Sequence, residues 1–91
     1  MITLNPELAF EYLDDGGVLI CQLERGDYWQ LSAPSGAIWS WIWGFRDFAT
    51  VVQQMVDQLG ASEPEAVGAL TELCDEFVAR RVVSSYRPPV A

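Results

Sequence analysis

The chain has 91 residues and a formal net charge of −8, because 13 carboxylate side chains face only five arginines and there is no lysine or histidine. A chain of this length holds one compact core, so we predict a single domain over residues 1–91. Hydrophobic residues make up 51% of the chain, which is too many for a disordered one. The negative charge repels phosphate backbones and argues against nucleic acid as a partner, whereas a basic peptide suits it.

The sequence shows no sign of a membrane segment, a disulfide or a cofactor. Apolar runs are too short to cross a bilayer, and the first residues lack the basic-then-apolar pattern of a signal peptide. We therefore expect a cytoplasmic protein without a membrane partner. Cys21 and Cys74 lie far apart with no pairing motif, which predicts two reduced thiols and no metal site. The glycines match neither a phosphate loop nor a dinucleotide fingerprint.

Three short strands are predicted in the first third of the chain. Residues 8–13 mix aromatic and aliphatic side chains and end in the turn sequence of residues 14–17. Residues 18–23 are nearly all apolar, as is typical of the central strand of a meander, and residues 24–26 turn again. No later segment is equally rich in strand formers, so the third strand, residues 27–31, is expected at the edge of the sheet with one side unpaired.

The rest of the chain predicts three helices, over about residues 34–43, 48–59 and 63–81. We expect the first helix to lie between Ser32 and Gly44, and the second between Asp47 and Gly60. The third is expected to begin at a capping box of Ser62 and Glu65 and to end at the Arg80-Arg81 pair. Residues 1–7 can add a short extended lead-in and Val82-Val83 a short terminal strand, before a tail at Arg87-Pro88-Pro89.

Strands followed by helices predict an α+β domain. We expect an N-terminal three-stranded antiparallel sheet followed by three α-helices. The short Gly60-Ala61 link would join the last two helices into a helix-turn-helix-like pair, which gives a winged helix-turn-helix-like composition. Catalysis is not supported, because the absence of histidine and lysine removes the usual bases and Schiff-base chemistry. Asp14-Asp15 and Asp75-Glu76 fit a turn and a solvated helix face better than an acid–base pair.

Two features suggest a binding surface on this fold. Alternation along residues 27–31 places Tyr28 and Trp29 on opposite faces, so one belongs to the core and the other is free for a partner. On the third helix, a stripe of smaller residues lies beside the main apolar stripe and either packs on the sheet or leaves a shallow groove; it consists of Val67, Thr71, Cys74 and Val78. Glu72, Asp75 and Glu76 would make that groove acidic. An extended peptide could dock there by adding a strand.

The motif order resembles the PqqD-like family over nearly the whole chain. The resemblance lies in Gly26-x-Tyr28-x-x-Leu31, in Ser35-Gly36-Ala37-x-Trp39, in a following glycine and an amphipathic helix ending in Leu59, and in Leu70, Leu73 and Phe77 of the last helix. Members of this family are leader-recognition elements of ribosomally synthesised, post-translationally modified peptide (RiPP) pathways. The chain is most similar to the stand-alone leader-binding proteins of lasso-peptide biosynthesis. It departs from the pattern at Ser32, where asparagine is frequent, and at Arg80-Arg81, where a glycine often ends the helix.

The resemblance implies a non-catalytic protein of three strands and three helices, without a cofactor. It also implies a precursor leader peptide that pairs with strand 27–31 and lies against the third helix. A separate leader peptidase would receive the bound precursor. The peptide-binding residues implied in this way are Tyr28, Trp29, Gln30, Leu31, Val67, Leu70, Thr71, Cys74, Asp75 and Val78.

Other functions remain open from the sequence. One is a PqqD-type peptide chaperone of another modified-peptide pathway. Another is a winged-helix protein that binds nucleic acid, which requires a basic recognition helix, whereas the third helix carries Glu63, Glu65, Glu72, Asp75 and Glu76. A third is a structural subunit whose exposed strand pairs with its own copy across a two-fold axis in a tight dimer. A weak homodimer of the peptide-binding protein is also left open.

Overall fold

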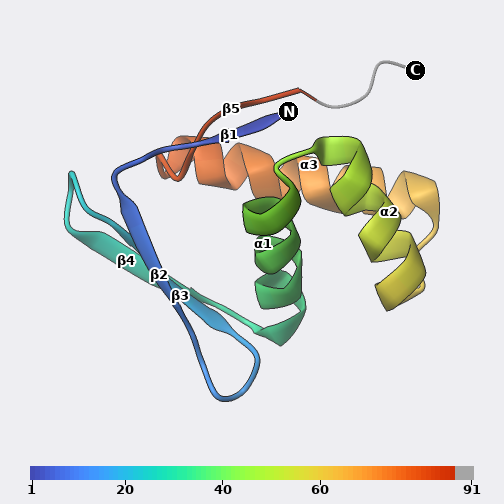
Figure 1. The fold of residues 1–91 in the computed structure, drawn as a ribbon, viewed down its shortest axis with the longest axis horizontal. Helices are drawn as coiled ribbons and strands as arrows, with labels where there is room; N and C mark the ends of the chain where they lie inside the picture. Colours follow the sequence, from blue (N-terminus) through green and yellow to red (C-terminus); the bar gives the residue numbers. More distant parts are fainter. Residues whose placement is uncertain (88–91) are drawn as a thin grey trace.

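The computed structural model describes residues 1–87, in which strands and helices are segregated along the chain (Figure 1). The elements are β1 (Ile2–Leu4), β2 (Leu8–Tyr12), β3 (Val18–Gln22), β4 (Asp27–Leu31), α1 (Ala33–Phe45), α2 (Phe48–Leu59), α3 (Glu63–Ala79) and β5 (Val83–Tyr86). The expected α+β class and the three strands of the meander are confirmed. They form an antiparallel sheet in the order β2-β3-β4. Most of the expected tail, residues 88–91, lies outside the described part.

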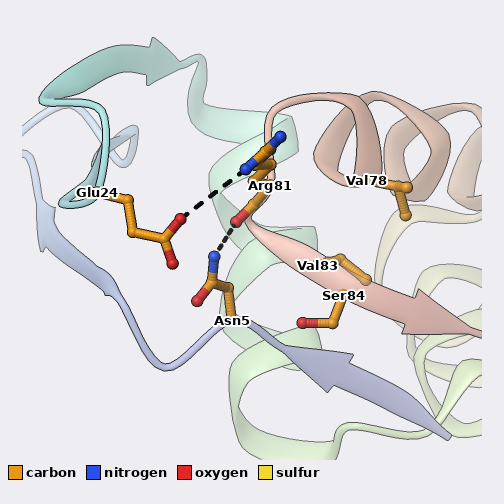
Figure 2. A pocket seen from close by; sticks show the side chains of 6 residues that line it. All are labelled: Asn5, Glu24, Val78, Arg81, Val83 and Ser84. Atoms are coloured by element: carbon orange, nitrogen blue, oxygen red, sulfur yellow. Dashed lines mark hydrogen bonds and ion pairs between the residues drawn. The ribbon is translucent and has the colours of Figure 1, made fainter.

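A second sheet forms where only loose extended segments were expected. β1 and β5 pair in an antiparallel ribbon, with Thr3 opposite Ser85, and this ribbon runs beside α3 (Figure 1). The Asn5 side-chain amide donates to the Arg81 carbonyl at 2.7 Å and ties the two termini together (Figure 2). The prediction of one sheet was therefore incomplete, and the winged-helix description omits this ribbon. Strands of three and four residues give little local signal, so their pairing depends on the packing of the termini.

The boundaries of α2 and the start of α3 follow the expected capping residues. The Asp47 carboxylate accepts hydrogen bonds from the Thr50 hydroxyl at 2.6 Å and from the Thr50 N–H at 3.1 Å. The hydroxyl bond first, and then the N–H bond, lower the pKa of Asp47. Gly60 ends α2 with a φ of 71°, a conformation that glycine adopts without strain. The Ser62 hydroxyl accepts a bond from the Glu65 N–H at 3.3 Å at the start of α3. These local signals are strong because Asp47 and Ser62 each satisfy an otherwise unpaired backbone N–H, and Gly60 adopts the left-handed conformation at no steric cost.

α1 begins after Ser32, as expected, but it ends later than the sequence predicted. Ser32 occupies the cap position but makes no side-chain capping bond. The helix continues through Gly44, where its end was expected, and stops at Arg46, which adopts a φ of 54°. The Arg46 carbonyl accepts a hydrogen bond from the Ile2 N–H at 2.8 Å. A bond from the distant N-terminus stabilises this end, so local sequence could not reveal it.

α3 ends slightly earlier than expected, and the paired arginines lie beyond its last turn. Arg80 is the cap residue, and Arg81 has a φ of 60°. The N–H groups of residues 81 and 82 donate to the carbonyls of Val78 and Phe77 at 3.1 and 2.8 Å. These two bonds form the Schellman pattern, in which an arginine takes the position usually held by glycine.

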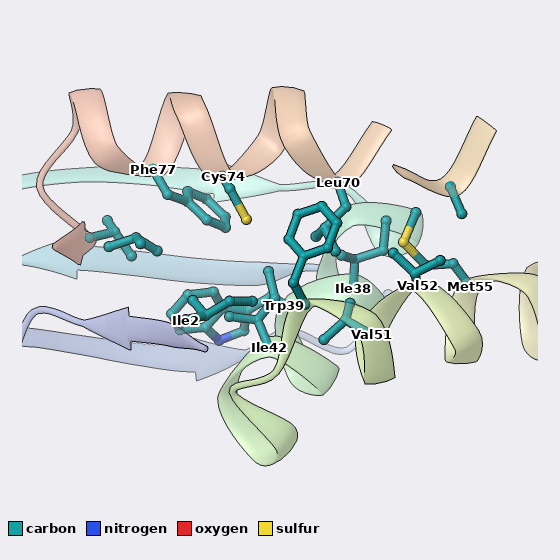
Figure 3. Close-up of a cluster of buried hydrophobic side chains, with 14 of the residues drawn as sticks. Ile2, Ile38, Trp39, Ile42, Val51, Val52, Met55, Leu70, Cys74 and Phe77 are labelled. Atoms are coloured by element: carbon teal, nitrogen blue, oxygen red, sulfur yellow. The ribbon is translucent and has the colours of Figure 1, made fainter. Parts of the chain in front are cut away.

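Trp39 of α1 lies at the centre of the core and is fully buried. Its ring meets those of Phe10 and Phe77 edge-on, at centroid distances of 5.3 and 5.5 Å, and so joins β2 to α3. Side chains from all three helices surround it (Figure 3). The sheet and the helices therefore share one core. Its main members are Ile2, Val18, Ile20, Ile42, Phe48, Val51, Met55, Leu70, Cys74, Phe77, Val82 and Val83.

Candidate functional site

β4 is an edge strand, as the sequence predicted. It pairs with β3 along its whole length, and no strand within residues 1–87 pairs with its other side. The strand passes almost directly into α1, so its position is fixed by the helix at one end and by the hairpin to β3 at the other (Figure 1). A strand held in this way offers a rigid row of backbone donors and acceptors.

The hydrogen-bond pattern shows which backbone groups of β4 are free. Leu23 directly follows β3, and its N–H donates to the Glu7 carbonyl at 2.9 Å, on the side of β2. The odd-numbered residues of β3 therefore also direct their backbone groups toward β2. Bonding direction alternates along an antiparallel strand, so even-numbered residues of β3 bond toward β4. In the observed register their partners are Asp27, Trp29 and Leu31. Tyr28 and Gln30 therefore direct their N–H and C=O groups to the open edge.

The side chains of β4 alternate between the two faces of the sheet. Trp29 and Leu31 are half-buried and pack against the core, whereas Tyr28 is 72% exposed and Gln30 is exposed on the outer face. Trp29 is thus the inward residue and Tyr28 the outward one, which resolves the two roles that the sequence left open. The indole Nε1 of Trp29 is buried and has no hydrogen-bond partner within the described residues.

The flank of α3 that lies beside β4 was not identified from the sequence. The Arg80 guanidinium lies 4.8 Å from the centre of the Trp29 ring, and its Nε lies 3.1 Å from a carboxylate oxygen of Glu76. Further along, Leu73 and Ala69 face the start of α1 across a depression of about 220 Å³. Residues 69, 73, 76 and 80 share one face of the helix, which therefore meets β4 at Arg80 and the start of α1 at Ala69 and Leu73. No periodic apolar pattern marks it, because two of its members are charged.

The stripe expected beside β4 lies on the opposite flank of α3. Val78 lines a pocket of about 320 Å³ together with Val83 and Ser84 of β5 (Figure 2). The Tyr86 hydroxyl of β5 donates to the Asp75 carboxylate, and this bond is the main reason that the pKa of Tyr86 rises to about 12. Val67 and Thr71, two further residues of the expected site, lie on the same flank because they precede Asp75 by two turns and one turn of the helix.

Leu70 and Cys74 are a second correction to the expected site, because both side chains are completely buried in the core. Burial raises the pKa of the Cys74 thiol to about 12, with a smaller contribution from the charge of Asp75. The thiol therefore stays protonated at neutral pH and is a poor nucleophile. The sequence showed which residues of α3 share a face, but it did not show on which side of the buried face β4 would lie.

Residues 1–87 contain no cluster of three or more potential metal ligands. No helix in the same part of the chain has the length and apolar character needed to cross a bilayer. Cys21 and Cys74 are both free thiols. The chemistry that this surface offers is thus hydrogen bonding, apolar contact and charge.

The fold and the site define a small α+β protein with an open sheet edge beside a helix. Residues 17–83 match the family model described as "Coenzyme PQQ synthesis protein D (PqqD)", and the chain belongs to this family. Its fold is similar to that of the solved structure "TbiB1 in Complex with the TbiA(beta) Leader Peptide", with a TM-score of 0.86 and 18% identity. The similarity covers 93% of this chain and 98% of the other. No curated protein sequence matches the chain.

Proposed function

We propose that this protein binds the leader segment of a ribosomally synthesised precursor peptide as an added strand on the free edge of β4. The observation that carries the proposal is the pair of outward-directed backbone units at Tyr28 and Gln30, in a strand without a second neighbour. In strand addition, backbone bonds supply affinity and pockets for alternate side chains supply specificity. Family membership and the leader peptide named in the similar complex support this function.

The proposed contacts combine the edge of β4 with the adjoining flank of α3. Tyr28, Trp29, Gln30 and Leu31 remain the strand contacts. An added strand would turn every second side chain toward the helices, where Trp29 and Leu31 lie. On α3 the contacts move from the expected stripe to the residues that face β4 and the start of α1, namely Ala69, Glu72, Leu73, Glu76 and Arg80.

The bound precursor is then presented to a separate leader peptidase, in the manner of the lasso-peptide proteins that the sequence resembles. The protein itself acts without a cofactor and without catalysis, and its work is to hold the leader in one extended conformation. Fixing the leader against a sheet leaves the rest of the precursor free for the enzyme. This role fits a domain whose exposed backbone and groove, and not a reactive side chain, distinguish its surface.

A second candidate is a peptide chaperone of another modified-peptide pathway, which the description of the matching family model favours. Both candidates share the binding step and differ in the enzyme that receives the precursor. The genes beside the coding sequence separate them. A precursor, a peptidase and a cyclising enzyme indicate the lasso pathway, and a radical enzyme of quinone-cofactor synthesis indicates the other.

The binding step is tested by replacing one outward-directed N–H. Gln30→Pro removes a donor from the open edge without removing a bond to β3, because the Gln30 N–H points away from β3. We expect it to weaken binding of a synthetic leader, taken from a precursor encoded beside this chain, by about tenfold or more, since a bond is lost and the proline ring meets the incoming strand. Calorimetric titration measures the affinity.

Tyr12→Pro is the matched control, because the Tyr12 N–H points to the free edge of β2 in the same way. We expect this variant to bind the leader as the parent does. Circular dichroism and thermal unfolding of both variants show whether the fold is kept. Parent-like affinity in a folded Gln30→Pro variant would show that the leader does not pair with β4.

A further inference from the structure

The depression between α1 and α3 lies where β4 passes into α1. Ile38 of α1 and Leu73 and Ala69 of α3 give it an apolar lining, and its polar lining consists of Ser35, Glu72 and Glu76. Ile38 is 8% exposed, so the floor reaches the core. Two carboxylates on the rim of an apolar depression form an amphipathic site, which differs from the all-apolar pockets that suit leucine or phenylalanine.

The position of the depression relative to β4 places it on the path of an added strand. α3 runs antiparallel to β4: Arg80 contacts Trp29 at one end, and Glu72 lines the depression with Ser35 at the other. A peptide that pairs with Tyr28 and Gln30 and continues toward α1 therefore passes this depression. Its helix-facing side chains reach the depression because side chains alternate along a strand.

The chain already shows which chemistry this flank of α3 accepts. The Nε of Arg80 pairs with a carboxylate oxygen of Glu76 at 3.1 Å, while its Cζ lies over the Trp29 ring, 4.8 Å from the ring centre. Glu72, one turn further along the same face, forms no ion pair within residues 1–87. A long basic side chain is complementary to the depression, because its apolar stem matches the apolar lining and its cationic head matches the carboxylates. The net charge of −8 also attracts a cationic ligand before it contacts the protein.

We infer that the depression lined by Ile38, Leu73 and Glu72 receives a lysine or arginine side chain of the bound peptide. The stem lies on Ile38 and Leu73, and the cation pairs with Glu72. This inference rests on the proposed function and makes it more specific: the leader carries a basic residue at a fixed distance from the segment that pairs with Tyr28 and Gln30.

The test uses random dodecapeptides displayed on phage and selected against the parent protein. Peptides whose binding is lost in Gln30→Pro are those that use the β4 edge, and we expect them to share a lysine or arginine at one position. One such peptide and its analogue with norleucine in place of the basic residue are then titrated against the parent and against Glu72→Gln. The parent should prefer the basic peptide by about threefold or more, as expected for a partly exposed ion pair, and Glu72→Gln should bind both equally.

Glu63→Gln is the matched control, because it removes the same charge from an exposed position at the start of α3. We expect it to keep the preference for the basic peptide. Edge-binding peptides without a shared basic residue, or a preference that persists in Glu72→Gln, would overturn the inference and leave strand addition intact. Selected peptides that bind Gln30→Pro as well as the parent would instead contradict the proposed function itself.

Discussion

The two edges of the three-stranded sheet, β2 and β4, differ in what lies beside them. Both direct a row of backbone groups away from β3. Beside β2, Phe10 packs against the ring of Trp43 at a centroid distance of 4.7 Å, and Arg46 lies over the same indole. β2 carries an exposed charge within the strand, Glu11, whereas the charge of β4, Asp27, is at the first residue of the strand. The two edges also border different hollows. Leu8 of β2 lines one of about 160 Å³ with Trp43 and Arg46, whereas β4 meets α3 at Trp29 and Arg80 and leads into α1, which borders the depression shared with α3.

This difference shows that an unpaired strand is not sufficient to define a peptide site. A charged residue on an edge strand discourages further pairing. A neighbouring helix has the opposite effect, because it gives the side chains of an added strand something to contact. Backbone groups bind any extended chain, so in the proposed function it is the flank of α3 that makes the β4 edge selective. The predictions below separate the support that the two edges share from the features that only β4 has.

The largest effect is expected at Trp39, on which both edges depend. Trp39→Ala should lower the free energy of unfolding by about 3–5 kcal/mol, because it leaves a cavity between β2, α1 and α3. Denaturation with urea measures this change. Trp43→Ala is the control: its side chain is 38% exposed beside β2, so the loss should be clearly smaller. Equal losses of unfolding free energy in Trp39→Ala and Trp43→Ala would mean that Trp39 has no special role in joining the sheet to the helices.

Hydrogen exchange of single amides compares the two edges directly. With the leader peptide at about 100 times its dissociation constant, exchange at Tyr28 and Gln30 should slow by up to about 100-fold, since bound amides exchange only from the free protein. The outward amides of β2, at Phe10 and Tyr12, should exchange at unchanged rates. Nuclear magnetic resonance resolves these sites. Protection along β2 with none at β4 would reverse the assignment of the edges.

The smallest change in the free energy of unfolding is expected in α3, the helix that contacts β4. Gly68 lies on the exposed side of α3, and a Cβ added there meets no atom within 4 Å. Gly68→Ala should raise the free energy of unfolding by about 0.5–1 kcal/mol through helix propensity, with unchanged affinity for the peptide.

Gly36→Ala provides the contrast for that substitution. The added Cβ would lie 2.5 Å from the Gly16 carbonyl oxygen, where α1 approaches the turn between β2 and β3. We expect this variant to be destabilised despite the higher helix propensity of alanine, because backbone atoms block the new methyl group. A gain in stability at both positions would show that the close approach of α1 to this turn has no energetic consequence.

Much of the fold follows from local signals. Asp47, Gly60 and Ser62 mark helix ends correctly because each acts on the backbone within a few residues of its own position. The C-terminal end of α1 does not follow, since Arg46 is held by a bond from Ile2 and Gly44 has no role in the termination. The ribbon of β1 and β5 likewise joins residues at opposite ends of the chain.

The sequence by itself determined that residues 27–31 form an edge strand, because no other segment had the composition to cover it. It also determined that α3 is amphipathic. Only the tertiary structure decided which flank of α3 faces β4. Helical periodicity identifies the buried face but treats its two flanks alike, so the side chains of Val78 and Leu73 were equally good candidates. β5 lies on the flank of Val78 and Asp75, where Tyr86 bonds to Asp75, and the flank of Leu73, Glu76 and Arg80 faces β4 and the start of α1.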